Sequence, residues 1–547
     1  MKRKKLDASK PKRTSKSELP PYWKYGLVFL VILLTALIRL RLLGCPLERD
    51  EGEYAYAGQL ILQGIPPYQL ACNMKLPGTY AAYALIIALF GQTPSAIHIG
   101  LLLINAATTL LVYLLGTRLF GWIAGLVACA CFAFLSLGQS VLGTAAHATH
   151  FVILPALGGI LLLLKAIEQR RTWTYLWSGL LFGLAFVMKQ PGIFFVVFAT
   201  FYYSWSEWQA RPADWRRRAA QGGLLVLGAL VPFGLTCFIL RAAGVFERFW
   251  FWTFSYARVY ATSLTVSQGI HKFSAMVPKI VGPSVLIWLI AGMGLVALIW
   301  DRKARVKAPF VIGLLLFSFL AACPGLYFRQ HYFVLMLPAA ALLAGAAVSL
   351  MERYFQRTNS LVFAPSMAFI AALGFSISQQ SAFLFDMDPV SACRAMYGMN
   401  PFPESLEIAK YLQEHTAPRD RVAVLGSEPQ IYFYARRHSA TGYIYTYGLM
   451  EEQKYALRMQ KEMIGEIEKA RPEYVVVANV ASSWLLQANS EGAILTWASQ
   501  YLKDQYALDG IVDILSEDRT VYRWGDDAGK YQPRSPVNLG IYKRKSP

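Results

Sequence analysis

Long apolar blocks recur along this chain, and they constrain its possible folds more than any other feature. The blocks run for about 14 to 22 residues each, with short polar or charged segments between them, close to the roughly 20 helical residues that a bilayer core requires. Only 16% of the residues are charged, against about 25% in a soluble protein. So many apolar blocks do not fit a soluble core, and the sequence predicts an α-helical multi-pass membrane protein.

The net charge of +20 is distributed in a way that indicates membrane topology. Residues 1–20 hold eight Lys or Arg against two acidic residues, and much of the remaining excess lies in short gaps between apolar blocks. Cationic loops stay on the cytoplasmic side of a membrane. We therefore expect a lipid bilayer and no nucleic acid as partner, and a disordered cytoplasmic tail over residues 1–20.

The short apolar segment 76–90 decides the topology. If it crossed the membrane, the basic loops 165–171, 211–218, 301–307 and 352–357 would all lie outside; if it is a juxtamembrane or re-entrant helix, they all lie inside, as the charge rule requires. The second arrangement is preferred, and it gives about eleven spans, an odd number that puts the C-terminal region outside. The spans are predicted at 22–43, 96–115, 120–137, 151–166, 174–187, 193–206, 221–240, 280–300, 309–322, 332–350 and 361–377.

Beyond the tail, the chain divides into a transmembrane domain over 21–378, with an outer loop over 45–95, and an extracytoplasmic domain over 379–547. The second region alternates helix-like and strand-like segments, which is typical of a small α/β domain. Helices are predicted at 405–414 and 451–469, and strands at 422–425, 474–477 and 511–515. No Gly-rich phosphate loop follows these strands, so no nucleotide site is predicted.

Four polar motifs fall on the predicted outer face. The first is the acidic run 50–54, where adjacent carboxylates either raise one pKa and bind a cation or form a solvated turn. The second begins at Lys75, which either serves a site or reaches toward the membrane interface. The third contains Lys189 in a tight connection, where a charge is costly near lipid unless it faces a polar cavity.

The fourth motif, 327–332, lies at the outer mouth of the tenth span. It combines Arg329, His331 and Tyr332. A guanidinium can hold a phosphate through two parallel hydrogen bonds, whereas tyrosines alone would also fit the aromatic belt of a membrane protein. One face thus gathers carboxylates and cations, which suits chemistry in which a general base takes a hydroxyl proton while cations stabilise a leaving phosphate.

In this order, the motifs 50–54, 75–78, 189–191 and 329–332 resemble those of the bacterial branch of the protein O-mannosyltransferase family (glycosyltransferase family 39-like). That family includes the aminoarabinose transferases of lipid A and has the GT-C fold. The resemblance covers about 27–338, and residues 400–434 are similar to the periplasmic domain of some members. It implies a polyprenyl-phosphate-linked sugar donor, a hydroxyl acceptor on protein, lipid or glycan, and transfer with inversion of the anomeric configuration.

The resemblance also implies residue roles. Asp50 would be the base that deprotonates the acceptor, and Glu51 would orient the acceptor or help to hold a divalent cation. Lys75 would face the donor phosphate, and Lys189, Arg329 and the neighbouring His331 and Tyr332 would contact the donor head group.

Several points stay open at the level of sequence. Relatives often carry an acidic residue in the loop 143–150, but here it has only His147 and His150 as candidate ligands, so a divalent cation is left open and no other cofactor is indicated. Arg39 and Arg41 either point into the site or reach the interface. Cys45 and Cys72 would both face the oxidising side, so a disulfide between them is one alternative.

Other activities compete with the transferase interpretation. A flippase or transporter, or a polymerase or ligase of polyprenyl-linked glycans, would also need a membrane bundle and a phosphate site. A transporter would favour inverted repeats and broken helices, and the sequence has no clear internal repeat. We therefore expect a polyprenyl-phosphate-sugar-dependent glycosyltransferase in the plasma (inner) membrane, with its site on the outer face.

Overall fold

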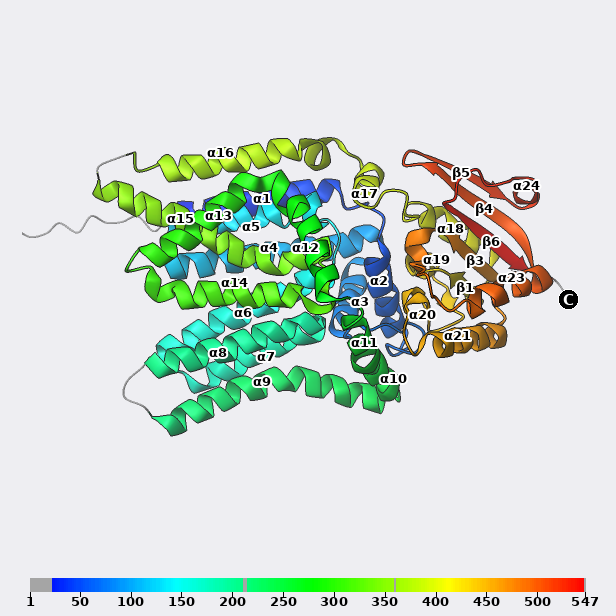
Figure 1. Ribbon diagram of the computed structural model, residues 1–547, viewed down its shortest axis with the longest axis horizontal. Helices are drawn as coiled ribbons and strands as arrows, with labels where there is room; N and C mark the ends of the chain where they lie inside the picture. The colour runs from blue at the N-terminus through cyan, green and yellow to red at the C-terminus, as the bar shows by residue number, and fades with distance from the viewer. Residues whose placement is uncertain (1–21, 210–213, 359–360, 546–547) are drawn as a thin grey trace, which may run out of the picture.

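The chain has a helical bundle at one end and an α/β domain at the other (Figure 1). The structure is a computed structural model, and it describes residues 22–209, 214–358 and 361–545. The predicted tail over residues 1–20 lies outside these ranges.

A helix lies at each of the predicted spans. Seven segments of the described chain are long and apolar enough to cross a bilayer: Tyr22–Arg41, Pro94–Phe120, Ala148–Gln169, Trp215–Ala242, Val266–Trp300, Arg305–Ala322 and Gln330–Arg357. The remaining four predicted spans correspond to shorter helices. The prediction of a multi-pass membrane protein is thereby confirmed. The span helices are α1 (Tyr22–Arg41), α4 (Pro94–Phe120), α5 (Trp122–Leu135), α6 (Ala148–Gln169), α7 (Thr172–Met188), α8 (Ile193–Gln209), α9 (Trp215–Ala242), α13 (Val285–Trp300), α14 (Ala308–Ala322), α15 (Leu337–Arg357) and α16 (Ala364–Gln379).

Helix packing explains which helices face lipid. The helix α15 is buried along most of its length, whereas α1 and α9 leave large apolar side chains such as Leu37 and Leu235 exposed, as expected for surfaces that contact lipid tails. The helices α7 and α9 pack closely because Gly179 sits at their contact, where an added Cβ would lie 2.1 Å from the Leu225 carbonyl oxygen. Small residues at such contacts let membrane helices approach.

The segment predicted as juxtamembrane forms α3 (Gly78–Phe90), a helix of 13 residues. It lies beside α2 (Arg49–Leu62) at the end of the bundle nearest the C-terminal domain (Figure 1). Its first turn is held by the Thr79 hydroxyl, which donates to the Met188 carbonyl at 2.8 Å. The ends of α8 and α9 that flank residues 210–213 lie at the opposite end of the bundle (Figure 1).

The C-terminal domain is built on a mixed six-stranded sheet of order β2-β1-β3-β6-β4-β5. The pairs β1–β2 and β1–β3 are parallel, and the pairs β3–β6, β6–β4 and β4–β5 are antiparallel. The strands are β1 (Arg421–Leu425), β2 (His438–Ser439), β3 (Tyr474–Asn479), β4 (Tyr506–Ser516), β5 (Arg519–Trp524) and β6 (Asn538–Arg544). The helices are α17 (Pro389–Tyr397), α18 (Glu404–His415), α19 (Gln430–Ala435), α20 (Tyr447–Met450), α21 (Ala456–Ala470), α22 (Ala481–Trp484), α23 (Ala493–Gln505) and α24 (Asp526–Gly529).

The domain rests on α2. The backbone of α2 at Gly52 lies so close to α19 that an added Cβ would be 2.6 Å from the backbone nitrogen of Gln430. Beside this contact, the buried Arg49 guanidinium pairs with the Glu428 carboxylate at 2.6 Å. The interface is therefore tight and partly charged, and it brings the C-terminal domain onto the acidic run.

Candidate active site

The acidic run starts a buried helix and does not form a solvated turn. Glu48 caps α2: its carboxylate accepts from the Glu51 backbone N–H at 3.0 Å, and the Glu51 carboxylate accepts from the Glu48 N–H in return. This reciprocal arrangement satisfies two free donors at the helix start. It places Asp50 in the first turn, where the partial positive charge of a helix N-terminus favours a carboxylate.

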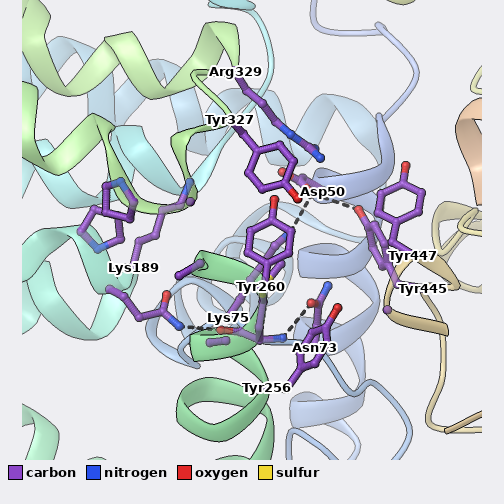
Figure 2. A pocket seen from close by; sticks show the side chains of 18 of the residues that line it. Asp50, Asn73, Lys75, Lys189, Tyr256, Tyr260, Tyr327, Arg329, Tyr445 and Tyr447 are labelled. Atoms are coloured by element: carbon purple, nitrogen blue, oxygen red, sulfur yellow. Dashed lines mark hydrogen bonds and ion pairs between the residues drawn. The ribbon is translucent and has the colours of Figure 1, made fainter. Parts of the chain in front are cut away.

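Asp50 lies in a dense set of contacts. Its Oδ1 atom is 2.6 Å from Lys75 Nζ and accepts from the Tyr445 hydroxyl at 2.9 Å, as the dashed lines in Figure 2 show. Lys75 also pairs with Glu53 at 2.8 Å. Burial raises the pKa of Asp50, but the Lys75 ammonium, with its hydrogen bond, and the nearby His331 and His147 together hold that pKa well below its usual range, so Asp50 is ionised.

A cavity of about 260 Å³ opens beside Asp50. Six of the seven predicted site residues line it, although they come from four separate stretches of sequence. They are Asp50, Lys75, Lys189, Arg329, His331 and Tyr332.

Two of the lining cations have no carboxylate partner. In the described chain, neither Lys189 nor Arg329 lies within 4.0 Å of an acidic side chain; Lys189 Nζ sits 4.4 Å from the Tyr332 ring centre, and the Arg329 guanidinium 5.8 Å from that of Tyr327. Burial lowers the pKa of Lys189 to about 7, and the Lys75 and Arg329 charges act in the same direction. Unpaired positive charge in a cavity indicates an anionic ligand.

Glu51 does not line this cavity. Its carboxylate accepts from the Ala146 backbone N–H at 2.6 Å and lies 3.1 Å from His98 Nε2. These contacts join α2 to α4 and to the loop before α6. The geometry thus gives Glu51 a positioning role for the helix that carries Asp50.

A possible metal-ligating group lies at the edge of the cavity and includes Asp50, His147 and His331. Their ligand atoms all lie within 4.8 Å of one another, and the two imidazole rings stack at 3.9 Å. Burial lowers the pKa of His147 to about 4, so this ring is neutral, as a metal ligand must be. His150, the other predicted candidate, is buried apart from this group.

Arg39 and Arg41 take neither of the roles considered for them. The buried Arg39 guanidinium donates to the carbonyls of Gly143 at 2.7 Å and Ser136 at 3.0 Å. Arg41 donates to carbonyls at the end of α16, including that of Phe383 at 2.7 Å. Both side chains satisfy backbone groups near the outer loop.

Sequence reasoning missed a set of tyrosines that line the cavity. Tyr445 and Tyr447 come from the C-terminal domain, and Tyr256 and Tyr260 from the segment after α9. Tyr256 donates to Glu451 of the C-terminal domain at 2.6 Å, so this wall joins both parts of the chain. Nothing in the sequence distinguished Tyr256 and Tyr260 from an aromatic belt at the membrane interface, and no local pattern connected Tyr445 and Tyr447 with the distant acidic run.

The fold and the site define a multi-pass membrane protein with a cavity lined by cationic side chains beside an ionised carboxylate. Residues 75–235, less than a third of the chain, match the family model described as dolichyl-phosphate-mannose-protein mannosyltransferase. This match confirms, over those residues, the predicted resemblance to the protein O-mannosyltransferase family. Among curated proteins, no sequence match to the chain was found.

Solved structures share the fold. The chain is similar to ArnT from Cupriavidus metallidurans in the apo state, with a TM-score of 0.57, 15% identity, and coverage of 94% of this chain and 99% of ArnT. For ArnT bound to undecaprenyl phosphate, the TM-score is 0.55 and the identity 14%, and the match covers 96% of this chain and 98% of ArnT. For the apo oligosaccharyltransferase of Archaeoglobus fulgidus, the TM-score is 0.53 and the identity 13%, and the match covers 93% of this chain and 75% of the oligosaccharyltransferase. These likenesses confirm the GT-C fold.

Proposed function

We propose that this chain is an inverting glycosyltransferase that moves a sugar from a polyprenyl-phosphate donor to a hydroxyl acceptor on the outer face of the membrane. The observation that carries the proposal is the cavity in which the ionised Asp50 lies near two cations without acidic partners, Lys189 and Arg329. ArnT, which shares the fold, has been solved with undecaprenyl phosphate bound, and this supports a lipid-phosphate donor.

The donor phosphate would supply the negative charge that pairs with Lys189 and Arg329. Arg329 can offer a planar pair of N–H donors to phosphate oxygens, and Lys189 a point charge. Tyr332 lies under Lys189 and lines the same wall, with His331 beside it. These residues, together with Lys75, would hold the phosphate while its bond to the sugar breaks.

Asp50 would act as the general base. In a single displacement the acceptor oxygen attacks the anomeric carbon, the bond from that carbon to the phosphate oxygen breaks, and the hydroxyl proton passes to the Asp50 carboxylate. The negative charge that develops on the departing polyprenyl phosphate would be stabilised by the cations. One displacement at one carbon inverts its configuration. Glu51 would keep α2 and therefore Asp50 in place.

The ligand set of Asp50, His147 and His331 fits a divalent ion that accepts imidazole, such as zinc. Neither ring nitrogen of His147 has a hydrogen-bond partner in the described chain, which leaves both free to bind. An ion held there would add positive charge near the leaving phosphate.

The placement of the site follows from the same proposal. All eleven predicted spans would cross the plasma (inner) membrane, including the four shorter helices α5, α7, α8 and α16. The transmembrane domain would cover 21–378 and the extracytoplasmic domain 379–547. The acceptor would enter between them and carry its hydroxyl on protein, lipid or glycan.

The substitution Asp50→Asn tests the chemistry. It keeps the size of the side chain but cannot accept a proton, so we expect transfer from a polyprenyl-phosphate sugar to fall by about 10²–10⁴-fold while the purified variant still binds the donor. Asp527→Asn, which changes an exposed carboxylate paired only loosely with Lys530 at 4.0 Å, is the matched control and should transfer sugar normally.

The same assay separates transfer from transport. An Asp50→Asn protein with ordinary transfer activity would exclude the base assignment. Reconstituted wild-type protein that moves the lipid-linked sugar across vesicles without transferring it would favour a flippase.

A further inference from the structure

Two cysteines from distant parts of the chain lie together outside the proposed spans. Cys45 follows α1 in the outer loop, and Cys393 lies on α17, at the start of the C-terminal domain. Both are buried, and together with Phe402 they form one small apolar cluster. Cys72 packs elsewhere: its thiol donates to the Tyr68 carbonyl at 3.1 Å. The structure therefore does not favour the pairing of Cys45 with Cys72 that the sequence left open.

The contact between these segments does not depend on the sulfur atoms. Arg41, at the end of α1, donates to the carbonyls of Phe383 at 2.7 Å and Leu384 at 3.1 Å. An added Cβ on Gly44 would lie 3.6 Å from Pro389 Cγ, an ordinary packing distance. The two segments are thus in contact directly before the cysteine pair.

We propose that Cys45 and Cys393 form a disulfide that fastens the C-terminal domain to the end of α1. The proposal rests on the outer-face orientation proposed above, because disulfides persist in oxidising compartments. Bond formation removes two protons and two electrons from the two thiols. The two protons and two electrons pass to the disulfide of a thiol–disulfide exchange protein, which is reduced to a dithiol as the new S–S bond forms.

The surroundings of the Cys45 thiol indicate when the disulfide forms during folding. The neighbouring Cys393 side chain and burial raise the pKa of the Cys45 thiol well above its usual value, and a protonated thiol is a poor nucleophile. The bond should therefore form before α17 is fully packed. Once formed, it would be shielded from added reductant.

The bond would act at the site through geometry. Cys45 precedes Asp50 by five residues, and Cys393 lies near the start of the domain that contains Tyr445. A cross-link between points more than 300 residues apart closes a long loop in the unfolded chain, which is where disulfides stabilise most in the chain-entropy account. It would hold the catalytic carboxylate and its tyrosine partner on one rigid unit.

Mass spectrometry of the full-length protein tests the pairing. Cells are quenched with acid, and free thiols are alkylated under denaturing conditions without reductant before digestion. We expect a peptide pair that links Cys45 to Cys393, with Cys72 alkylated. Cys72→Ser should keep the linked pair, and Cys393→Ser should release Cys45 for alkylation.

Two results would overturn the proposal: alkylation of both Cys45 and Cys393 in the wild type, or a link from Cys45 to Cys72. A topology reporter fused at Glu414 in the same strain separates the causes. Free thiols with the reporter outside overturn the pairing alone, and free thiols with the reporter in the cytoplasm overturn the orientation as well.

Discussion

The surroundings of Lys189 determine the pH range in which its side chain is charged. It faces Tyr332, with Asp50, Lys75 and Arg329 as the nearby charged groups and the His147 and His331 rings close by. Its pKa is lowered to about 7, so the free enzyme holds it as an ammonium only below that pH. The charged form binds a phosphate, so we expect kcat/KM for the donor to fall as pH rises through about 7.

The variant Lys189→Arg checks this assignment, since a guanidinium keeps its charge throughout the range. Its pH profile should lose the decline near 7, whatever its absolute activity. A wild-type profile that is flat between pH 6 and 8 would contradict the prediction.

Tyr445 tests whether the C-terminal domain takes part in the chemistry. Its hydroxyl donates to Asp50 at 2.9 Å, and a hydrogen bond to a charged group contributes about 1.5–3 kcal/mol. Tyr445→Phe should therefore lower kcat by roughly 10-fold or more, with KM for the donor little changed. Tyr443→Phe, in the same segment but bonded to Glu462 instead, should leave kcat near the wild-type value.

At the residue scale, the site residues that can be predicted from the sequence are those whose charge is costly near lipid. Lys75, Lys189 and Arg329 are charges beside apolar runs, and only a shared polar cavity explains all three. Tyr260 was not predictable, because tyrosine is also expected at a membrane interface, and Tyr445 was not, because its contact with Asp50 is long-range. The resemblance places Glu51 in the site, but a one-residue step along a helix turns a side chain by about 100°, and the Glu51 carboxylate points toward Ala146 and does not line the cavity.

At the scale of elements, a buried ion pair lies within the contact between α2 and the C-terminal domain. The Arg49 guanidinium pairs with Glu428 at 2.6 Å and donates to the Ser427 carbonyl at 2.8 Å. Removal of one partner leaves a buried charge uncompensated, which typically costs about 3–5 kcal/mol. Arg49→Met should therefore lower the melting temperature in detergent and speed proteolytic release of the C-terminal domain.

Two further variants make this test specific. The double change Arg49→Met with Glu428→Gln removes both charges and should recover much of the lost stability. Lys530→Met, which breaks an exposed pair, should change stability by less than about 1 kcal/mol. If Arg49→Met melts and is cleaved like the wild type, the ion pair does not hold the domain.

The elements themselves were predictable to different degrees. The strands β1 and β3 carry runs such as Val475 and its neighbours that are typical of buried strands. The apolar segment that forms α3 is predicted as a juxtamembrane helix from its length and the surrounding charges. The strands β5 and β6 were missed, since their residues are mostly polar or half-buried and the sheet alone stabilises them. Their pairing is long-range, and no local pattern encodes it.

For the whole molecule, the decisive question is which side of the membrane holds the site. In the structure, the ends of α8 and α9 near residues 210–213 and those of α15 and α16 near residues 359–360 lie at the end of the bundle away from the C-terminal domain (Figure 1). These ends carry basic residues such as Arg217 and Arg357. Cationic loops stay in the cytoplasm, which supports the proposed orientation with the C-terminal domain and the cavity on the outer face.

Reporter fusions along the chain test this orientation. Fusions after Arg171, Arg218 and Lys307 should report the cytoplasm, and fusions after Gln190 and at Glu414 the outside, because an odd number of proposed spans separates each site of the first group from each site of the second. A cytoplasmic signal at Glu414 would mean that α3 crosses the membrane. Since a crossing α3 would put Asp50 and the C-terminal domain on opposite faces of the membrane, that result would also contradict the contact of Asp50 with Tyr445 and with it the proposed mechanism.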